Sequence, residues 1–276
     1  MDVIEIQIGG GTLGYIFIAA GKYSGISTRS EFIASLAREI KDSDLGYAGF
    51  KSRERLAEYL SSAVFDSAEE RSDYSIALDN DKIIAIAKEV LGKCIVALPS
   101  HPIHIFVFPT FSSFVENNMY GTTGYTPWQQ TMLVFINPRN TCWQNALEGT
   151  IAHEYNHTVF LTHRQCNSLV DSLIFEGLAE HFREQVLHSG HAPWTQVLNE
   201  NEARKVLAKL SENHSIESID QNLRKAVFFG NDKYALWSGY SIGYQIVMSF
   251  LQENPRMAWP EIMAVPPKEI FNCFDF

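Results

Sequence analysis

The 276-residue sequence predicts an α+β fold, in which a small mixed sheet is preceded and followed by helices. Short runs rich in β-branched and aromatic residues gather in the middle of the chain between prolines, as is typical of strands. These runs cover residues 94–98, 103–108 and 131–136. The segments before and after them repeat apolar residues at the spacing of amphipathic helices. We expect a single domain over 1–276, with a mostly helical portion 1–92, a sheet and helix pair at 93–190, and a helical portion 191–276.

A β-hairpin is expected at the start of the chain. Residues 3–8 alternate apolar and polar side chains, and the glycines 9–11 separate them from a second β-branched run at 15–18. Residues 9–14 also fit the G-x-G-x-x-G pattern of nucleotide-binding turns, but that pattern must open a helix. Because the run that follows is aromatic and β-branched, the glycine-rich hairpin is favoured.

Helices are expected in the rest of the first third and after the sheet. Capping residues, apolar periodicity, and stops at Gly92 and at Asn254-Pro255 mark their ends. The expected helices cover residues 29–40, 52–65, 80–91, 141–161, 168–187, 195–210 and 236–251.

The composition excludes several classes of protein. Lys and Arg number 22 against 32 Asp and Glu, a net charge of −10, and no run of basic residues offers a surface for nucleic acid. No uncharged apolar run approaches the roughly 18 residues that span a membrane, and the N-terminus lacks the basic start of a secretory signal. The four cysteines are scattered without a C-x-x-C pair, which fits a reducing compartment. We expect a cytoplasmic protein that binds neither nucleic acid nor membrane.

The centre of the sequence carries an H-E-x-x-H motif, formed by His153, Glu154 and His157. Residues four apart lie on one face of a helix, so the two imidazoles can bind one metal ion while Glu154 stands beside the water position. Chance would supply only about 0.02 such matches in a chain of this composition. The motif therefore predicts a catalytic zinc site, in which three protein ligands and a water surround the metal.

Two residues are candidates for the third ligand. His163 has the spacing of the H-E-x-x-H-x-x-G-x-x-H pattern, but Phe160 stands where that pattern needs a glycine to turn the chain. Glu176, on the next expected helix, is favoured, because an antiparallel helix can direct a carboxylate toward the histidine pair. Glu180, one turn later, can ligate instead or orient a ligand, and Asp171 is another carboxylate that can orient a ligand, although either also suits an ordinary helix surface.

The residues 153–157, 176–180 and 239–244 together resemble a known family. H-E-x-x-H followed by Glu in an E-G-[LF]-A-E context is similar to the gluzincin metallopeptidases, and the three segments resemble the YjaZ-like bacterial family of predicted zinc-dependent proteases, built on a domain of unknown function. The resemblance covers roughly residues 80–255. It implies a zincin-like gluzincin fold, with His153, His157 and Glu176 on zinc and Glu154 as general base.

Other residues are candidates for binding and stabilising the substrate. Tyr240 lies in a Tyr-x-x-Gly segment similar to the one that carries the catalytic tyrosine of the aminopeptidase branch, and an oxyanion needs such a donor. Tyr244, one turn later, is the alternative, and it is a substrate-binding candidate together with His163. The expected strand 131–136 either offers an edge to an extended peptide or is a sheet strand without a ligand, and residues 121–127 form either a lid or a surface loop. The G-x-M-E-N segment that captures a free amine is missing, which argues against an aminopeptidase.

Taken together, these patterns predict a zinc metallopeptidase that holds one Zn²⁺ per chain and acts on a peptide or protein substrate. Another zinc hydrolase, acting on an amide or ester, and a catalytically silent zinc-binding regulatory module are the alternatives. The intact Glu154 argues against the silent module, because such a module has no need of a general base.

Overall fold

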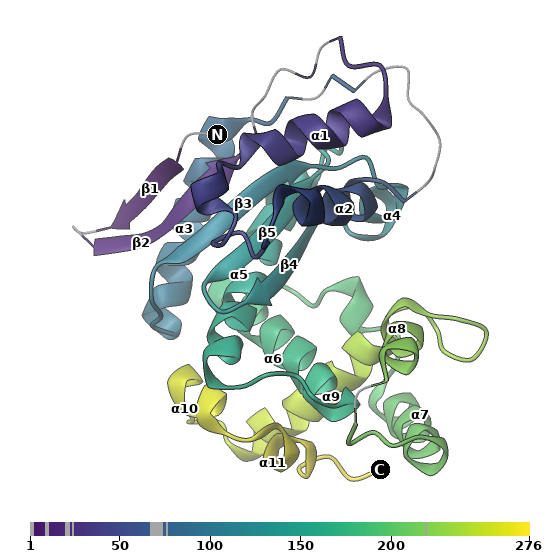
Figure 1. The fold of residues 1–276 in the computed structure, drawn as a ribbon. Coiled ribbons are helices and arrows are strands. Elements are labelled where there is room, and N and C mark those ends of the chain that lie inside the picture. Colours follow the sequence, from purple (N-terminus) through teal and green to yellow (C-terminus); the bar gives the residue numbers. More distant parts are fainter. Residues whose placement is uncertain are drawn as a thin grey trace. The chain divides into compact units, whose positions relative to one another are not determined.

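The computed structural model describes residues 3–8, 11–19, 23, 25–66, 74–75, 77–218 and 220–276. It confirms the α+β class, with a small mixed sheet and many helices (Figure 1). The chain divides into two compact units, which are described separately. The first comprises Met1–Val96 and Ser100–Thr158, and the second comprises Ala97–Pro99 and Val159–Phe276. The expectation of a single domain stays a prediction.

The first unit contains the sheet. Its strands are β1 (Val3–Ile8), β2 (Gly11–Ile18), β3 (Ile103–Pro109), β4 (Thr122–Trp128) and β5 (Thr131–Ile136). Their order is β1-β2-β3-β5-β4. The pairs β2–β3 and β3–β5 are parallel, whereas β1–β2 and β4–β5 are antiparallel. The expected N-terminal hairpin is confirmed by the antiparallel pairing of β1 and β2, while Gly9 and Gly10 of its predicted turn lie outside the described residues.

Three expectations about the middle of the chain are wrong. Residues 94–97 are not a strand, because the preceding helix continues through Gly92 to Ala97 and ends only at the Pro99 segment. The strand Thr131–Ile136 has no open edge for a peptide, since β3 pairs with one side of it and β4 with the other. Residues 122–127 are neither lid nor loop, because they belong to β4, the last strand of the described sheet.

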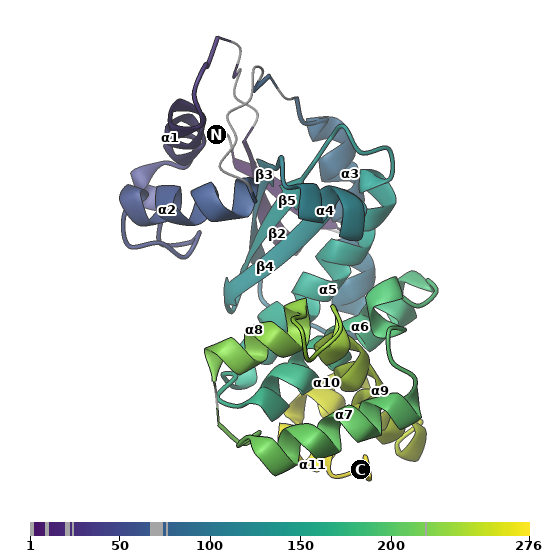
Figure 2. The same cartoon turned by 90° about the vertical axis from the view of Figure 1, so that its right-hand side faces the viewer.

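Helices cover both faces of the sheet in the first unit. Figure 2 shows α1 (Arg29–Glu39) and α2 (Arg53–Val64) on one side, and α3 (Asn80–Ala97) and α5 (Trp143–His163) on the other. A short helix, α4 (Ser113–Asn118), and a 3₁₀ turn, η1 (Asp42–Asp44), complete the unit. The core under α1 and α2 is aromatic, with Phe32, Phe65 and Tyr74 packed together beside Phe106 and Phe135 of the sheet. The side chains of α5 approach β4 on the opposite face.

The second unit is helical and is built around one pair of helices. α6 (Leu169–Leu187) packs against α9 (Ser238–Glu253). The other elements are η2 (Pro193–Thr195), α7 (Glu200–Asn213), α8 (Gln221–Phe229), α10 (Trp259–Ala264) and α11 (Pro267–Phe271). The expected helix 195–210 is therefore a 3₁₀ turn followed by α7. Sequence analysis missed α8, α10 and α11, as well as α4 and β4 in the first unit.

The contact between α6 and α9 is made backbone to backbone by two glycines. A Cβ on Gly177 would lie 2.5 Å from the carbonyl carbon of Gly243 and 2.8 Å from Cγ2 of Val247. A Cβ on Gly243 would lie 3.3 Å from the amide nitrogen of Gly177, and closer still to the carbonyl oxygen of Leu173. All of these distances are shorter than an ordinary van der Waals contact, so neither helix can carry a side chain at this crossing.

Within the described part of the chain, no helix combines the length and the apolar character needed to cross a membrane.

Candidate active site

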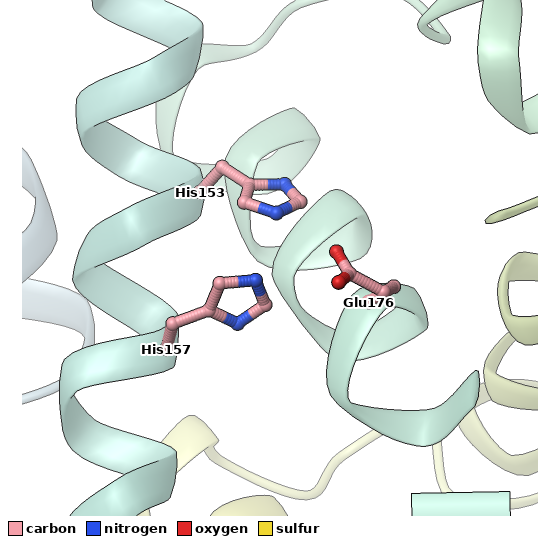
Figure 3. A group of neighbouring side chains, drawn as sticks. All are labelled: His153, His157 and Glu176. Atoms are coloured by element: carbon pink, nitrogen blue, oxygen red, sulfur yellow. The ribbon is translucent and has the colours of Figure 1, made fainter. Parts of the chain in front are cut away.

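Three of the predicted site residues come together. His153 and His157 lie on α5 and Glu176 lies on α6. One ligand atom from each of the three falls within 4.8 Å of the other two. Figure 3 shows the two imidazoles and the carboxylate turned toward one another. Among the described residues, this is the group of three or more His, Cys, Asp or Glu side chains that can hold a metal ion.

The donor set fits zinc. The imidazole rings of His153 and His157 lie with their centroids 4.4 Å apart and nearly perpendicular, at 83°, as expected for residues one helical turn apart. Two imidazole nitrogens and one carboxylate oxygen are the kind of ligands that catalytic zinc takes. His157 and Glu176 are buried, and His153 is half-buried.

Glu154 occupies a buried position against β4. Only 5% of its surface is exposed, and its Oε2 accepts a hydrogen bond of 2.6 Å from the hydroxyl of Thr126. The carboxylate also lies over Gly124, where a Cβ would come within 2.5 Å of Oε1 and 2.7 Å of Cδ. The middle of β4 therefore determines where this carboxylate can lie.

Glu176 has a basic neighbour on α8. Nη2 of Arg224 lies 3.9 Å from Oε1 of Glu176, and Nε of Arg224 donates to the hydroxyl of Ser172, one turn earlier on α6. The guanidinium also covers the ring of Phe228 at 5.3 Å. Burial raises the pKa of the nearby Cys166 thiol to about 12, so this thiol is protonated at neutral pH.

The two other predicted carboxylates have contacts outside the metal group. Glu180 is fully buried on α6, where its oxygens accept from Nε of Arg183 at 3.0 Å and from the indole of Trp194 at 2.8 Å. Asp171 lies in the first turn of α6, and its carboxylate accepts from the amide of Asn167 at 2.8 Å. In the described structure both side chains hold loops at the ends of α6.

His163 and Tyr240, two of the residues predicted to bind or stabilise the substrate, lie on different helices. His163 is exposed at the end of α5, and because the helix continues through Phe160, His163 lies about 15 Å along the axis from His153. Tyr240 is half-buried at the start of α9, with its ring against Phe228.

Tyr244, one turn later, is buried, and its hydroxyl, ring and carbonyl oxygen all make contacts. Its hydroxyl donates to Glu184 at 2.9 Å, its ring stacks on His181 at 4.0 Å, and its carbonyl oxygen accepts from Nε2 of His181 at 3.0 Å. Burial lowers the pKa of His181, in keeping with a neutral ring that donates through Nε2. Burial and the contact with Glu184 raise the pKa of Tyr244, so its phenol stays protonated. These contacts fasten α9 to α6.

Sequence reasoning missed three residues next to the site: Gly124, Thr126 and Arg224. Gly124 and Thr126 stood inside a segment interpreted as a lid or loop. Once that segment is a strand, their spacing of two residues places both on one face of it. Arg224 lies on α8. The apolar residues of this segment recur at helical spacing and so predict a helix, but this helix was not among those expected from the sequence.

Comparison with known proteins adds a family match. A family model described as "Predicted Zn-dependent protease" matches residues 83–272. The protein YjaZ of Bacillus subtilis (strain 168), which is itself named uncharacterized, is 26% identical over 137 residues, or 48% of this chain and 52% of YjaZ. The uncharacterized protein YjfC of the same organism is 26% identical over 136 residues, or 44% of each chain. The chain thus spans about half the length of the curated relatives it matches.

Proposed function

Because the chain belongs to the family of predicted zinc-dependent proteases, we propose that it is a peptidase of the gluzincin type with a zincin-like fold. The observation that carries the proposal is the meeting of His153, His157 and Glu176, with Glu154 next to His153 on the same helix. A carboxylate at that position is what hydrolysis by an activated water requires.

We assign His153, His157 and Glu176 as the ligands of one Zn²⁺ per chain. Zinc, when bound, supplies Lewis acidity: it polarises a substrate carbonyl and makes a water molecule more acidic. The protein contributes two neutral imidazoles and one carboxylate, and burial of His157 and Glu176 keeps water from competing for these groups.

Glu154 acts as the general base and then as the general acid. Its carboxylate accepts a proton from the attacking water and hands it to the amine that leaves when the peptide bond breaks. Tyr240 is the proposed hydrogen-bond donor to the oxyanion of the tetrahedral intermediate. Its helix, α9, is held against α6 by the contact of Gly177 with Gly243, one residue from Glu176.

The substrate is an extended peptide or protein segment that pairs with β4. β4 is the last strand in the order of the described sheet. It is therefore β4, and not Thr131–Ile136 as the sequence suggested, whose edge binds the peptide in this proposal. Backbone pairing accepts many sequences, whereas the side chains beside it give preference. Tyr125 and Trp128 are 48% and 40% exposed on β4, so large apolar side chains are favoured in the bound peptide.

The test is the zinc content of purified protein after reconstitution, measured by emission spectroscopy, together with cleavage of a mixed peptide library. Wild-type protein is expected to hold about one zinc per chain and to cleave peptides, with cleavage abolished by a chelator. His157→Ala is expected to lose both properties, while the matched control His163→Ala, on the same helix, keeps them. Zinc-free wild-type protein, or cleavage of esters but no peptide, would contradict the proposal.

A further inference from the structure

We propose that β4 positions the general base, through the hydroxyl of Thr126 and the absence of a side chain at Gly124. The inference rests on the proposed function, since it assigns Thr126 and Gly124 as positioning residues for Glu154. Neither residue is part of the H-E-x-x-H pattern, and both lie about 30 positions before it in the sequence.

The hydroxyl of Thr126 has one proton and two acceptors within reach. It lies 2.6 Å from Oε2 of Glu154 and 3.3 Å from the backbone carbonyl oxygen of the same residue. The shorter contact takes the proton, because an ionised carboxylate is the stronger acceptor and a distance of 2.6 Å is typical of an O–H···O⁻ bond. Thr126 is itself buried, so no water replaces the hydroxyl at this place. The bond therefore fixes Oε2.

Gly124 provides the room in which the carboxylate lies. A Cβ at this position would come within 2.5 Å of Oε1 and 2.7 Å of Cδ of Glu154, well inside ordinary contact. Gly124 is not among the glycines with positive φ, so the need for glycine here is one of space and not of backbone conformation. Since residues two apart on a strand share a face, Gly124 and Thr126 act on the carboxylate from the same side of β4.

This arrangement gives the two oxygens of the carboxylate different tasks. Oε2 is held by Thr126, whereas Oε1 lies over Gly124, which has no side chain to displace it. Oε1 is then the oxygen that accepts the proton from water. A free glutamate side chain samples several rotamers, and a displacement of about 1 Å at a reacting group can cost on the order of 100-fold in rate. Holding one oxygen keeps the other in place.

Three substitutions test the inference in the zinc-loaded protein. Thr126→Val removes the hydroxyl at nearly constant volume and is expected to lower kcat by about 10- to 100-fold, with KM and zinc content nearly unchanged. Thr126→Ser keeps the hydroxyl and is expected to restore most of kcat. Gly124→Ala is expected to lower kcat as well, because its Cβ displaces Oε1.

Thr122→Val is the matched control. Thr122 is buried on the same face of β4, but its hydroxyl donates to the carbonyl oxygen of Trp143 at 3.2 Å and not to Glu154. This variant loses one buried hydrogen bond, as Thr126→Val does, and is expected to keep kcat. Equal kcat in Thr126→Val and wild type, or an equal loss of kcat in Thr122→Val, would overturn the inference.

A binding measurement separates this inference from the proposed function. A simple hydroxamate, such as benzohydroxamate, chelates zinc and donates a hydrogen bond to a carboxylate beside the metal. Wild-type protein and Thr126→Ser are expected to bind the hydroxamate with equal affinity. Thr126→Val is expected to bind it about 3- to 10-fold more weakly, which is roughly the loss of affinity expected from one hydrogen bond. If zinc-loaded wild-type protein binds no hydroxamate and cleaves no peptide, the proposed function fails. If wild-type protein does both and Thr126→Val matches it, only the positioning role fails.

Discussion

Replacing Gly177 by alanine is expected to disturb the contact on which the second unit is built. The new Cβ would lie 2.5 Å from the carbonyl carbon of Gly243, about 0.9 Å inside the 3.4 Å at which ordinary contact begins. It would also lie 2.8 Å from Cγ2 of Val247. The first of these obstacles is backbone, which cannot rotate away, so α9 must move off α6 as a whole.

The free energy of unfolding should fall by about 2–3 kcal/mol. Overpacking of this kind costs about 1–3 kcal/mol and sometimes more, and a backbone obstacle belongs at the upper end of that range. Alanine gains up to about 1 kcal/mol over glycine inside a helix, which offsets part of the cost. For a chain of this size the net loss corresponds to a decrease in the thermal midpoint of roughly 5–10 °C.

The assay is thermal unfolding followed by circular dichroism, with Gly190→Ala as the matched control. Gly190 lies in the same unit, and a Cβ there would have no atom within 4 Å. This control is expected to unfold at the wild-type temperature. A Gly177→Ala protein that unfolds at the wild-type temperature would refute the close packing of α6 against α9.

Three further substitutions probe other contacts. Arg224→Ala should weaken zinc binding about 10-fold in chelator competition, because the guanidinium 3.9 Å from Glu176 helps to orient that carboxylate. Tyr125→Ala should raise KM several-fold for peptides with large apolar residues and leave kcat unchanged, while Tyr120→Ala, an exposed tyrosine outside β4, should change neither. His181→Gln should flatten the pH dependence of stability below pH 6.5. Burial lowers the pKa of His181 from the ordinary 6.5, so the unfolded chain binds more protons as pH falls and wild-type stability decreases.

Each of these expectations has an outcome that would contradict it. For Arg224, the control is Arg55→Ala, whose partner Glu58 is exposed on α2, and equal zinc affinity in both variants would remove the orienting role. For Tyr125, an unchanged KM across peptides of different side chains would show that β4 gives no preference. For His181, urea unfolding from pH 7 to pH 5 would contradict the argument if the wild type and His181→Gln lost stability in parallel.

Local patterns in the sequence predicted the parts of the site that depend on helical spacing. His153 and His157 meet because residues four apart share a helix face, whatever the rest of the fold does. The hairpin of β1 and β2 was predicted for a similar reason, since alternation and glycines act over a few residues. The prediction of Glu176 as the third ligand needed the additional assumption of a second helix beside the first. The position of Glu176 close to His153 and His157 agrees with that assumption.

The contacts that the sequence did not predict depend on pairing between distant segments. Thr126 reaches Glu154 only because β4 pairs with β5, and nothing within the segment 121–127 shows that pairing. A strand was also predicted where there is none. The β-branched residues in 94–98 suggested a strand, although the helix that precedes them continues to Ala97. Tertiary context outweighs propensity in such short runs. Arg224 needed α8, an element that had not been predicted.

The most direct measurement of the proposed function compares peptide hydrolysis by zinc-reconstituted wild-type protein and Glu154→Gln, with zinc content measured in the same samples. The substitution keeps the shape of the side chain and removes its ability to accept a proton. We expect about one zinc per chain in both proteins and a rate in Glu154→Gln at least about 100-fold below that of the wild type. Hydrolysis by Glu154→Gln at the wild-type rate would contradict the assignment of Glu154 as the general base.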